Sequence, residues 1–337
     1  MIRRTLKAVS NWISEQIHIF PGMSIHPVLS LLTARKASGS LPGKRNDAAR
    51  LALVAEGGAM RGIVSCAMLA VLEAAGLREA FDLVVGCSAG AMNGAAFLAG
   101  VAGACRDEYC GAYTLRAFIN PWRFLIGKAA VDVDYTLRFS NATLDADRHR
   151  RALESPIPLF CLATEVEGAR RSVLSDFQNL AEQRAAFLAT SSLPLIAGGP
   201  VGYRGRHYLD GGLVEAIPVA TAKELGATHM LVLQTRPMGL RYPPPKGLGN
   251  RIAERQLAKL NPALVPLYHN RNRVYDATCN FILAEEAKGA EAEIPTLALR
   301  LPEGTPSVDR LETRREILHE RASTSEEYTR SRLRQTL

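Results

Sequence analysis

Between residues 51 and 99 the sequence alternates strand-length apolar segments with helical ones, and this pattern restricts the possible folds more than any other. Residues 51–55 form a short apolar run that ends at two glycines, and residues 81–85 form a second run. Residues 63–75 have the three- and four-residue apolar spacing of a helix, and residues 89–99 are rich in small side chains that pack closely. Strand, helix, strand, helix is typical of a parallel sheet with right-handed crossovers. The sequence therefore predicts an α/β fold with a mostly parallel central sheet.

Further strands and helices are expected downstream. The strands are a hairpin of residues 159–166 and 171–174, a short strand at 203–209 interrupted by Gly205, an apolar strand at 229–234 and one near 294–301. The helices lie at about 179–190, 218–225 and 263–288, with a charged helix from about 307. Residues 236–249 are predicted to be a loop because they hold four prolines and three glycines.

The overall composition is that of an ordinary globular protein. Hydrophobic residues make up 47% and charged residues 22%, which allows a sizeable core and argues against wholesale disorder. No run approaches the roughly 20 consecutive apolar residues of a membrane span. Polar residues interrupt the segment after the basic start, so we expect no secretion signal. Six cysteines without paired spacing indicate reduced thiols of a cytoplasmic protein, not a disulfide framework or a zinc site.

Most of the formal net charge of +8 lies in the first fifty residues, where eight Lys or Arg minus Glu15 and Asp47 gives +6. Residues 2–20 have apolar side chains at helical spacing, and residues 37–49 are small, polar and turn-rich, as in a linker. The helix is expected either to pack on the main domain or to lie on a membrane surface. Anionic phospholipid fits this arm better than nucleic acid because no nucleic-acid-binding motif accompanies the charge.

The first candidate for chemistry is Gly86-Cys87-Ser88-Ala89-Gly90, which fits Gly-x-Ser-x-Gly between a predicted strand and a predicted helix. A sharp strand-to-helix turn exposes the serine hydroxyl, and side chains at the flanking glycine positions would collide. The turn also sets Ser88 at a helix N-terminus, where amide groups can stabilise an oxyanion. A purely structural tight turn is the alternative interpretation.

A second candidate is the glycine-rich loop Gly57-Gly58-Ala59-Met60-Arg61-Gly62, again between a strand and a helix. Such loops expose backbone amides to an anion. A dinucleotide fingerprint would need an acidic residue at the end of the next strand, but that strand leads into Ser88 instead. The loop is therefore better interpreted as an oxyanion hole that faces Ser88.

The third candidate is Asp210, which is followed by Gly211 and Gly212 at the end of a predicted strand. Alone, an acid before two glycines is usually only a turn. Beside a serine it can act as a base. The reference pKa of aspartate, about 3.9, is below that of imidazole, about 6.5, but burial raises it.

A Ser–Asp–His triad is the alternative, since His229 and His269 follow the serine in sequence. Folds with that triad usually place several strands before the serine, whereas here one strand and one helix precede it. His229 opens an apolar strand, His269 lies on a polar helical patch, and His207 precedes Asp210 on its strand. We therefore expect these histidines to be structural or exposed.

Taken together, the three elements resemble the patatin-like phospholipase family, in its bacterial branch, in type, order and spacing. Ser191-Ser192-Leu193-Pro194 also resembles the family's approach to its aspartate. The resemblance covers roughly residues 50–235. Weaker similarity continues through residues 120–124 and the C-terminal third.

The resemblance implies a three-layer α/β/α fold and acyl-ester hydrolysis by a Ser–Asp dyad, without a metal or organic cofactor. By position, Ser88 would be the nucleophile and Asp210 the base. The glycine loop, Gly57 to Gly62, would supply the oxyanion hole through the amides around Gly58 and Ala59, with Arg61 bracing it. Ala59 departs from the family, which usually has a third glycine there, and a positive φ would cost alanine about 1 kcal/mol.

We thus expect a basic arm with a linker (1–49), a catalytic domain (50–235) and a C-terminal helical extension with one strand packed on it (236–337). The expected activity is serine acyl-ester hydrolysis of lipids, a phospholipase or lipase function. A non-catalytic lipid-binding protein and an acyltransferase remain alternatives. The expected partners are a lipid ester substrate and an anionic membrane contacted peripherally from the cytoplasm, with no nucleic acid.

Overall fold

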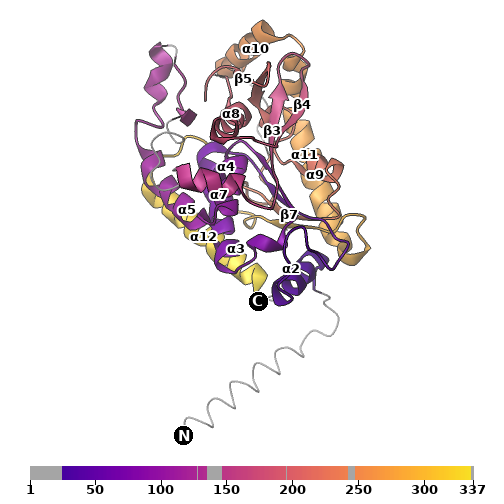
Figure 1. The fold of residues 1–337 in the computed structure, drawn as a ribbon. Helices are drawn as coiled ribbons and strands as arrows, with labels where there is room; N and C mark the ends of the chain where they lie inside the picture. Colours follow the sequence, from indigo (N-terminus) through magenta and orange to yellow (C-terminus); the bar gives the residue numbers. More distant parts are fainter. Residues whose placement is uncertain (1–24, 127, 135–145, 195, 242–246, 335–337) are drawn as a thin grey trace, which may run out of the picture.

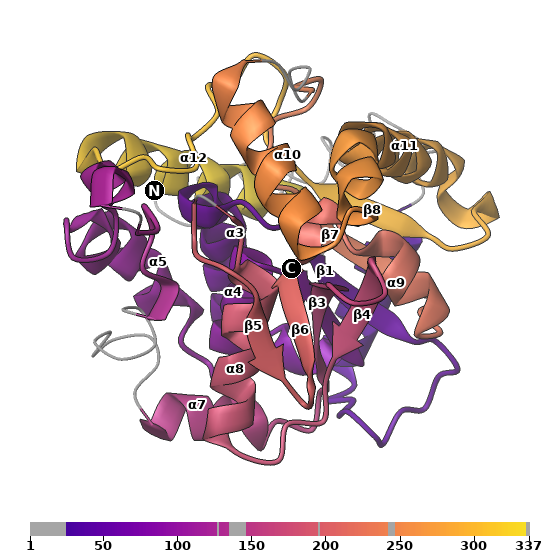
Figure 2. The same ribbon diagram turned by 90° about the horizontal axis from the view of Figure 1, so that it is seen from above.

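The computed structural model describes residues 25–126, 128–134, 146–194, 196–241 and 247–334. Their strands form one eight-stranded sheet with helices on both faces (Figures 1 and 2). The strands are β1 (Leu51–Ala55), β2 (Leu83–Cys87), β3 (Leu159–Glu165), β4 (Arg170–Leu174), β5 (Val201–Tyr203), β6 (Arg206–Asp210), β7 (His229–Leu233) and β8 (Thr296–Leu299). The α-helices are α2 (Pro27–Ala37), α3 (Ile63–Ala74), α4 (Ala89–Leu98), α5 (Ala102–Cys110), α7 (Ala146–Leu153), α8 (Leu180–Ser191), α9 (Val219–Glu224), α10 (Leu248–Leu260), α11 (Leu264–Lys288) and α12 (Arg315–Leu333). Short 3₁₀ turns are η1 (Ala59–Gly62), η2 (Arg78–Ala80), η3 (Ala112–Thr114), η4 (Pro121–Ile126), η5 (Gly211–Leu213) and η6 (Gly289–Glu291).

The sheet has the order β5-β6-β3-β2-β1-β7-β8, with β4 also paired to β3. The run from β3 to β8 is parallel throughout. Strands β4 and β6 both run antiparallel to β3, and β5 pairs antiparallel with β6. The predicted mostly parallel sheet is therefore confirmed, and so is the hairpin of β3 and β4.

The two faces of the sheet bury separate apolar layers, as the alternation of side chains along a strand requires. On β1, Leu51 and Leu53 join the core beneath α2, α3 and α12. Ala52 and Val54 point the other way, into a core shared with α9 and α11. Figure 2 shows α3 and α12 on one side of the strands and α9 and α11 on the other. The result is the three-layer α/β/α arrangement.

Two expectations about local structure are wrong. The strand expected at 203–209 is a hairpin of β5 and β6, because Arg204 (φ 46°) and Gly205 (φ 77°) form a tight turn between them. Helix α10 begins at Leu248, inside the range 236–249 that was expected to be a loop. The sequence analysis did not predict α10, in which Leu257 is the only fully buried side chain.

At the N-terminal end, the helix expected at residues 2–20 lies outside the described residues, whereas α2 was not expected. Arg35 of α2 ties that helix to the sheet, because it contacts Asp47 and Asp82 at 2.7 Å each. Residues 38–50 form turns and extended chain, as the linker composition predicted. No helix within the described ranges is both long enough and apolar enough to span a bilayer.

Candidate active site

Ser88 lies at the sharp turn between β2 and α4, with φ 54° and ψ −127°. A Cβ on Gly86 would come within 2.4 Å of the Ala91 backbone, and one on Gly90 within 2.3 Å of the Ala55 carbonyl oxygen. Only glycine fits at either position, so the spacing of this motif is a steric requirement of the turn. Beneath it, Cys87 is fully buried. The amide of Ser88 donates to the Thr190 hydroxyl at 2.9 Å.

Asp210 reaches the same place from β6, which lies on the same edge of β3 as β2, because β4 occupies the other edge. The register pairs Cys87 with Leu162 and Asp210 with the next residue, Ala163, so the ends of β2 and β6 meet along β3. This end-to-end meeting of the two strands brings Ser88 and Asp210 together. A Cβ on Gly211 would lie 2.4 Å from the Leu162 carbonyl oxygen, so this turn also requires glycine.

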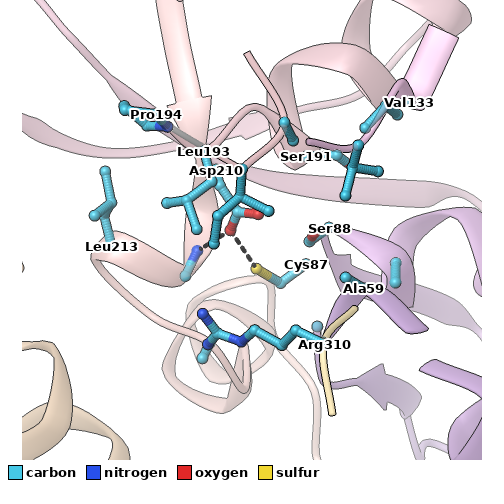
Figure 3. Close-up of a pocket in the computed structure, with 18 of the residues that line it drawn as sticks. Ala59, Cys87, Ser88, Val133, Ser191, Leu193, Pro194, Asp210, Leu213 and Arg310 are labelled. Carbon is cyan, nitrogen blue, oxygen red and sulfur yellow. Dashed lines mark hydrogen bonds between the residues drawn. The ribbon is translucent and has the colours of Figure 1, made fainter. Parts of the chain in front are cut away.

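The carboxylate of Asp210 accepts hydrogen bonds from neighbouring groups of the protein. Its Oδ1 atom accepts from the Gly212 amide at 2.6 Å and contacts the Cys87 thiol at 3.8 Å (Figure 3). Burial raises the pKa of Asp210, and the Gly212 amide, a side-chain hydrogen bond with Ser88 and the positive charge of Arg310 each oppose that rise. The result is a carboxylate with a raised pKa in contact with a serine hydroxyl, the combination that a general base needs.

The glycine loop packs directly against the serine turn, since a Cβ on Gly57 would lie 2.9 Å from the Cys87 carbonyl oxygen. The Gly57 amide donates to the Ala216 carbonyl at 3.2 Å. By contrast, the described residues offer no acceptor to the amides of Gly58 and Ala59, and both residues line the pocket. These two amides therefore match the oxyanion-hole expectation best. Ala59 has φ 50°, the left-handed conformation that a third glycine would adopt without strain.

Arg61 does not contact the pocket but lies buried behind the loop. Its Nε atom donates to the Thr235 hydroxyl at 3.2 Å, and that hydroxyl donates to the Gly57 carbonyl at 3.1 Å. Gly62 is equally constrained, because a Cβ there would come within 2.5 Å of the Tyr109 hydroxyl. The loop is thus held from behind by Arg61 and packed closely at its end.

The histidines considered for a triad lie elsewhere. His229 begins β7, at the edge of the sheet where parallel strands start, whereas Ser88 follows the end of β2. His207 is exposed and contacts Glu167 at 2.7 Å, and His269 pairs with Glu254 at 3.1 Å. Among the described residues no histidine lines the pocket that holds Ser88.

A cavity of about 480 Å³ opens at Ser88 and Asp210 (Figure 3). Its walls are mainly apolar and come from α5, the segment after η3, the stretch before β5, and α10 with α11. The larger apolar side chains are Met92, Tyr109, Tyr113, Phe118, Val131, Val133, Leu193, Ile196, Leu213, Leu257 and Tyr268. Such a volume and lining suit a substrate with a hydrocarbon portion.

The model of the family described as patatin-like phospholipase matches residues 53–223. The chain belongs to the patatin-like phospholipase family. Members of this family are in general lipid acyl hydrolases. The matched residues span β1 to α9 and so include the glycine loop, the serine turn and the aspartate turn.

Two individual proteins resemble parts of this patatin-like chain. The uncharacterized protein YjjU of Escherichia coli (strain K12) is 33% identical over 198 residues, which is 58% of this chain. The match spans 54% of the length of YjjU, about half. The crystal structure of VipD from Legionella pneumophila aligns over 89% of this chain and 73% of its own, at 10% identity and a TM-score of 0.39.

Two residues near Ser88 and Asp210, namely Thr190 and Arg310, were not predicted from the sequence. Thr190 precedes Ser191 in α8 and joins two parts of the site, since it accepts from the Ser88 amide and donates to the Leu162 carbonyl. Arg310 comes from the loop before α12 and lines the pocket beside Asp210. Its carbonyl also accepts from the Met60 amide at 3.2 Å, so it contacts the glycine loop as well.

Proposed function

We propose that this protein is a lipid acyl-ester hydrolase that uses Ser88 as nucleophile and Asp210 as general base. The observation that carries the proposal is the contact between Ser88, whose backbone has a strained positive φ, and the buried carboxylate of Asp210. Both residues line one largely apolar pocket. The family placement supports lipid acyl hydrolysis in general.

In the proposed first half-reaction, the Ser88 oxygen attacks the ester carbonyl carbon while Asp210 accepts the hydroxyl proton. The carbonyl oxygen becomes an oxyanion, which the Gly58 and Ala59 amides stabilise. When the carbon–oxygen bond of the ester breaks, Asp210 returns the proton to the departing alcohol. Water then attacks the acyl-serine, with Asp210 again taking and returning one proton, and the fatty acid leaves.

Three supporting proposals accompany this mechanism. The apolar walls hold the acyl chain, so the substrate is a lipid ester that the protein meets at an anionic membrane from the cytoplasm. Residues 50–235 form the catalytic unit, residues 1–49 the basic arm, and residues 236–337 an extension that completes the pocket through α10, α11 and Arg310. Transfer of the acyl group to an alcohol instead of water is distinguished by product analysis with added acceptors.

The decisive experiment compares Ser88→Ala and Asp210→Asn with the unaltered protein, on p-nitrophenyl esters and then on mixed phospholipids. Ser88→Ala should abolish both turnover and covalent labelling by a fluorophosphonate. Asp210→Asn keeps the size of the side chain but removes the base, so kcat should fall roughly 10³-fold or more. Folded protein that neither labels at Ser88 nor hydrolyses any ester would refute the hydrolase proposal, and lipid binding by that protein would support the non-catalytic alternative.

Histidine variants test the absence of a triad. His207→Gln, His229→Gln and His269→Gln should each retain most of the activity, because these side chains lie away from the pocket. Loss of turnover in one of them, together with a nearly harmless Asp210→Asn, would replace the dyad by a Ser–Asp–His mechanism.

A further inference from the structure

Helix α10 lies over the pocket and presents two different faces. Its inner face lines the cavity through Asn250, Ala253 and Leu257, which follow each other at helical spacing. The opposite face carries exposed basic side chains at every fourth position, Arg251, Arg255 and Lys259. With about 100° between successive residues, this basic stripe lies roughly opposite Leu257 and so points away from the pocket. Figure 1 shows α10 at one end of the molecule, above the sheet.

Two exposed apolar side chains accompany this stripe. Leu248, at the start of α10, is 73% exposed, and Trp122, in η4, is 71% exposed. These are the two most exposed large apolar side chains among the described residues. Phe118 and Val131, on either side of η4 in the sequence, line the same pocket as Asn250 and Ala253 of α10. Trp122 and Leu248 therefore lie close in sequence to two segments that line one pocket.

We propose that the outer stripe of α10, together with Leu248 and Trp122, forms a docking face that binds the surface of an anionic bilayer. This inference rests on the proposed function, and it names the surface by which the protein meets the lipid. Tryptophan favours the interface between headgroups and hydrocarbon, and a basic stripe is attracted to anionic lipid. The acidic residue of α10, Glu254, lies off the stripe and pairs with His269 at 3.1 Å. Glu254 therefore does not pair with the stripe, and the positive charges of the stripe face solvent.

The structure provides a matched control at the opposite edge of the sheet. Lys36, Lys44 and Arg50 are also exposed, and they lie near α2 and the start of β1. Because the pocket lies where the parallel strands end, these three residues are remote from the docking face. Their replacement removes the same charge from the first fifty residues, whose positive charge the sequence alone suggested as a membrane anchor.

Binding is measured with the full chain carrying Ser88→Ala, so that vesicles are not degraded. The vesicles contain equal parts of phosphatidylglycerol and phosphatidylcholine, with pure phosphatidylcholine for comparison. The triple variant Arg251→Gln, Arg255→Gln, Lys259→Gln should have a roughly tenfold or more lower affinity for the anionic vesicles. Each basic residue near a charged membrane surface contributes favourable binding free energy, which the variant loses. The triple variant Lys36→Gln, Lys44→Gln, Arg50→Gln should bind nearly as well as its parent. Equal loss in both variants, or loss in the second alone, would overturn the proposal.

Tryptophan fluorescence provides a second measurement, which does not require a variant with weakened vesicle binding. The sequence contains two tryptophans, Trp12 and Trp122, so Trp12→Phe leaves a single reporter on the docking face. Its emission should shift to the blue on anionic vesicles, and brominated lipid should quench it. An unchanged emission from vesicle-bound protein would show that another surface makes the contact.

Failure of this proposal is distinguishable from failure of the proposed function. The α10 triple variant with Ser88 intact should still hydrolyse a water-soluble p-nitrophenyl ester at the parental rate, because its three positions lie outside the pocket lining. Parental vesicle binding by this variant would refute the docking face and leave the hydrolase intact. Binding of duplex DNA that depends on the stripe, without vesicle binding, would assign the stripe to nucleic acid and also refute it.

Discussion

The Arg61 guanidinium and the Thr235 hydroxyl form a buried link behind the glycine loop, with 3.2 Å between Nε and Oγ1. The same hydroxyl donates to the Gly57 carbonyl, and the Thr235 amide donates to the buried carboxylate of Glu56 at 2.6 Å. Strand β7, which ends just before Thr235, thereby fixes the loop that follows β1. We expect the position of the neighbouring Gly58 and Ala59 amides to depend on this link.

Arg61→Ala should therefore lower kcat more than it raises KM, by roughly tenfold or more, because a displaced amide stabilises the oxyanion less than a fixed one. Arg61 acts through the loop and is a positioning residue, so Arg61→Lys should restore part of kcat. Steady-state kinetics on a soluble ester measure the effect. Unchanged kcat in Arg61→Ala would limit the side chain to a packing role.

The pH dependence of the reaction should follow Asp210. Its pKa is raised by burial, and the carboxylate must be ionised to accept the serine proton. kcat/KM should then fall as the pH drops through a value above the ordinary range of aspartate, with no required step near the imidazole pKa of about 6.5.

Arg310 allows a second test of the pH dependence, because its positive charge lowers the pKa of Asp210. Arg310→Gln should raise that pKa further and move the acid limb of the profile to higher pH. Arg310→Lys should leave the limb nearly in place. Arg273→Gln removes an exposed charge outside the pocket lining and serves as the matched control. An equal shift of the acid limb in Arg273→Gln would show that the overall charge of the protein, and not the proximity of Arg310 to Asp210, causes the shift.

Ala59 offers a test of backbone strain. At φ 50°, alanine is disfavoured relative to glycine by about 1 kcal/mol, whereas the freedom of glycine in the unfolded chain offsets up to about the same amount. Ala59→Gly should therefore not lower the free energy of unfolding. Ala258→Gly, on the exposed side of α10, should lower it by about 1 kcal/mol.

Chemical denaturation measures both changes, and the kinetics of the same proteins add a second readout. If Ala59 displaces an oxyanion-hole amide, Ala59→Gly should also raise kcat. A loss of stability as large as that of Ala258→Gly would show that the positive φ carries no cost at this position.

The parts of the site that sequence could predict are those fixed by local sterics. A Cβ at Gly86 would collide with the Ala91 backbone, and one at Gly90 or Gly211 would collide with the Ala55 or Leu162 carbonyl of the neighbouring strand. The tight turns therefore demand glycine, and this pattern is visible in a short stretch of chain. Arg310 was missed because only the long-range packing of the C-terminal loop brings it beside Asp210. Helix α10 was also missed: only Leu257 is fully buried, and it packs against residues as distant in the sequence as Val166 and Leu209.

The meeting of Ser88 and Asp210 at the ends of β2 and β6, along one edge of β3, makes the assembly of the candidate site depend on folding of the sheet. The two residues are far apart in the chain, and they meet only after β3 has paired with both β2 and β6. Such long-range pairings form late, because loop closure must precede them. During refolding, the rate of fluorophosphonate labelling should therefore rise only when the whole sheet is assembled. A nascent chain that has not yet completed β6 would carry the proposed nucleophile without its proposed base, so we expect no ester hydrolysis until synthesis has passed the aspartate turn.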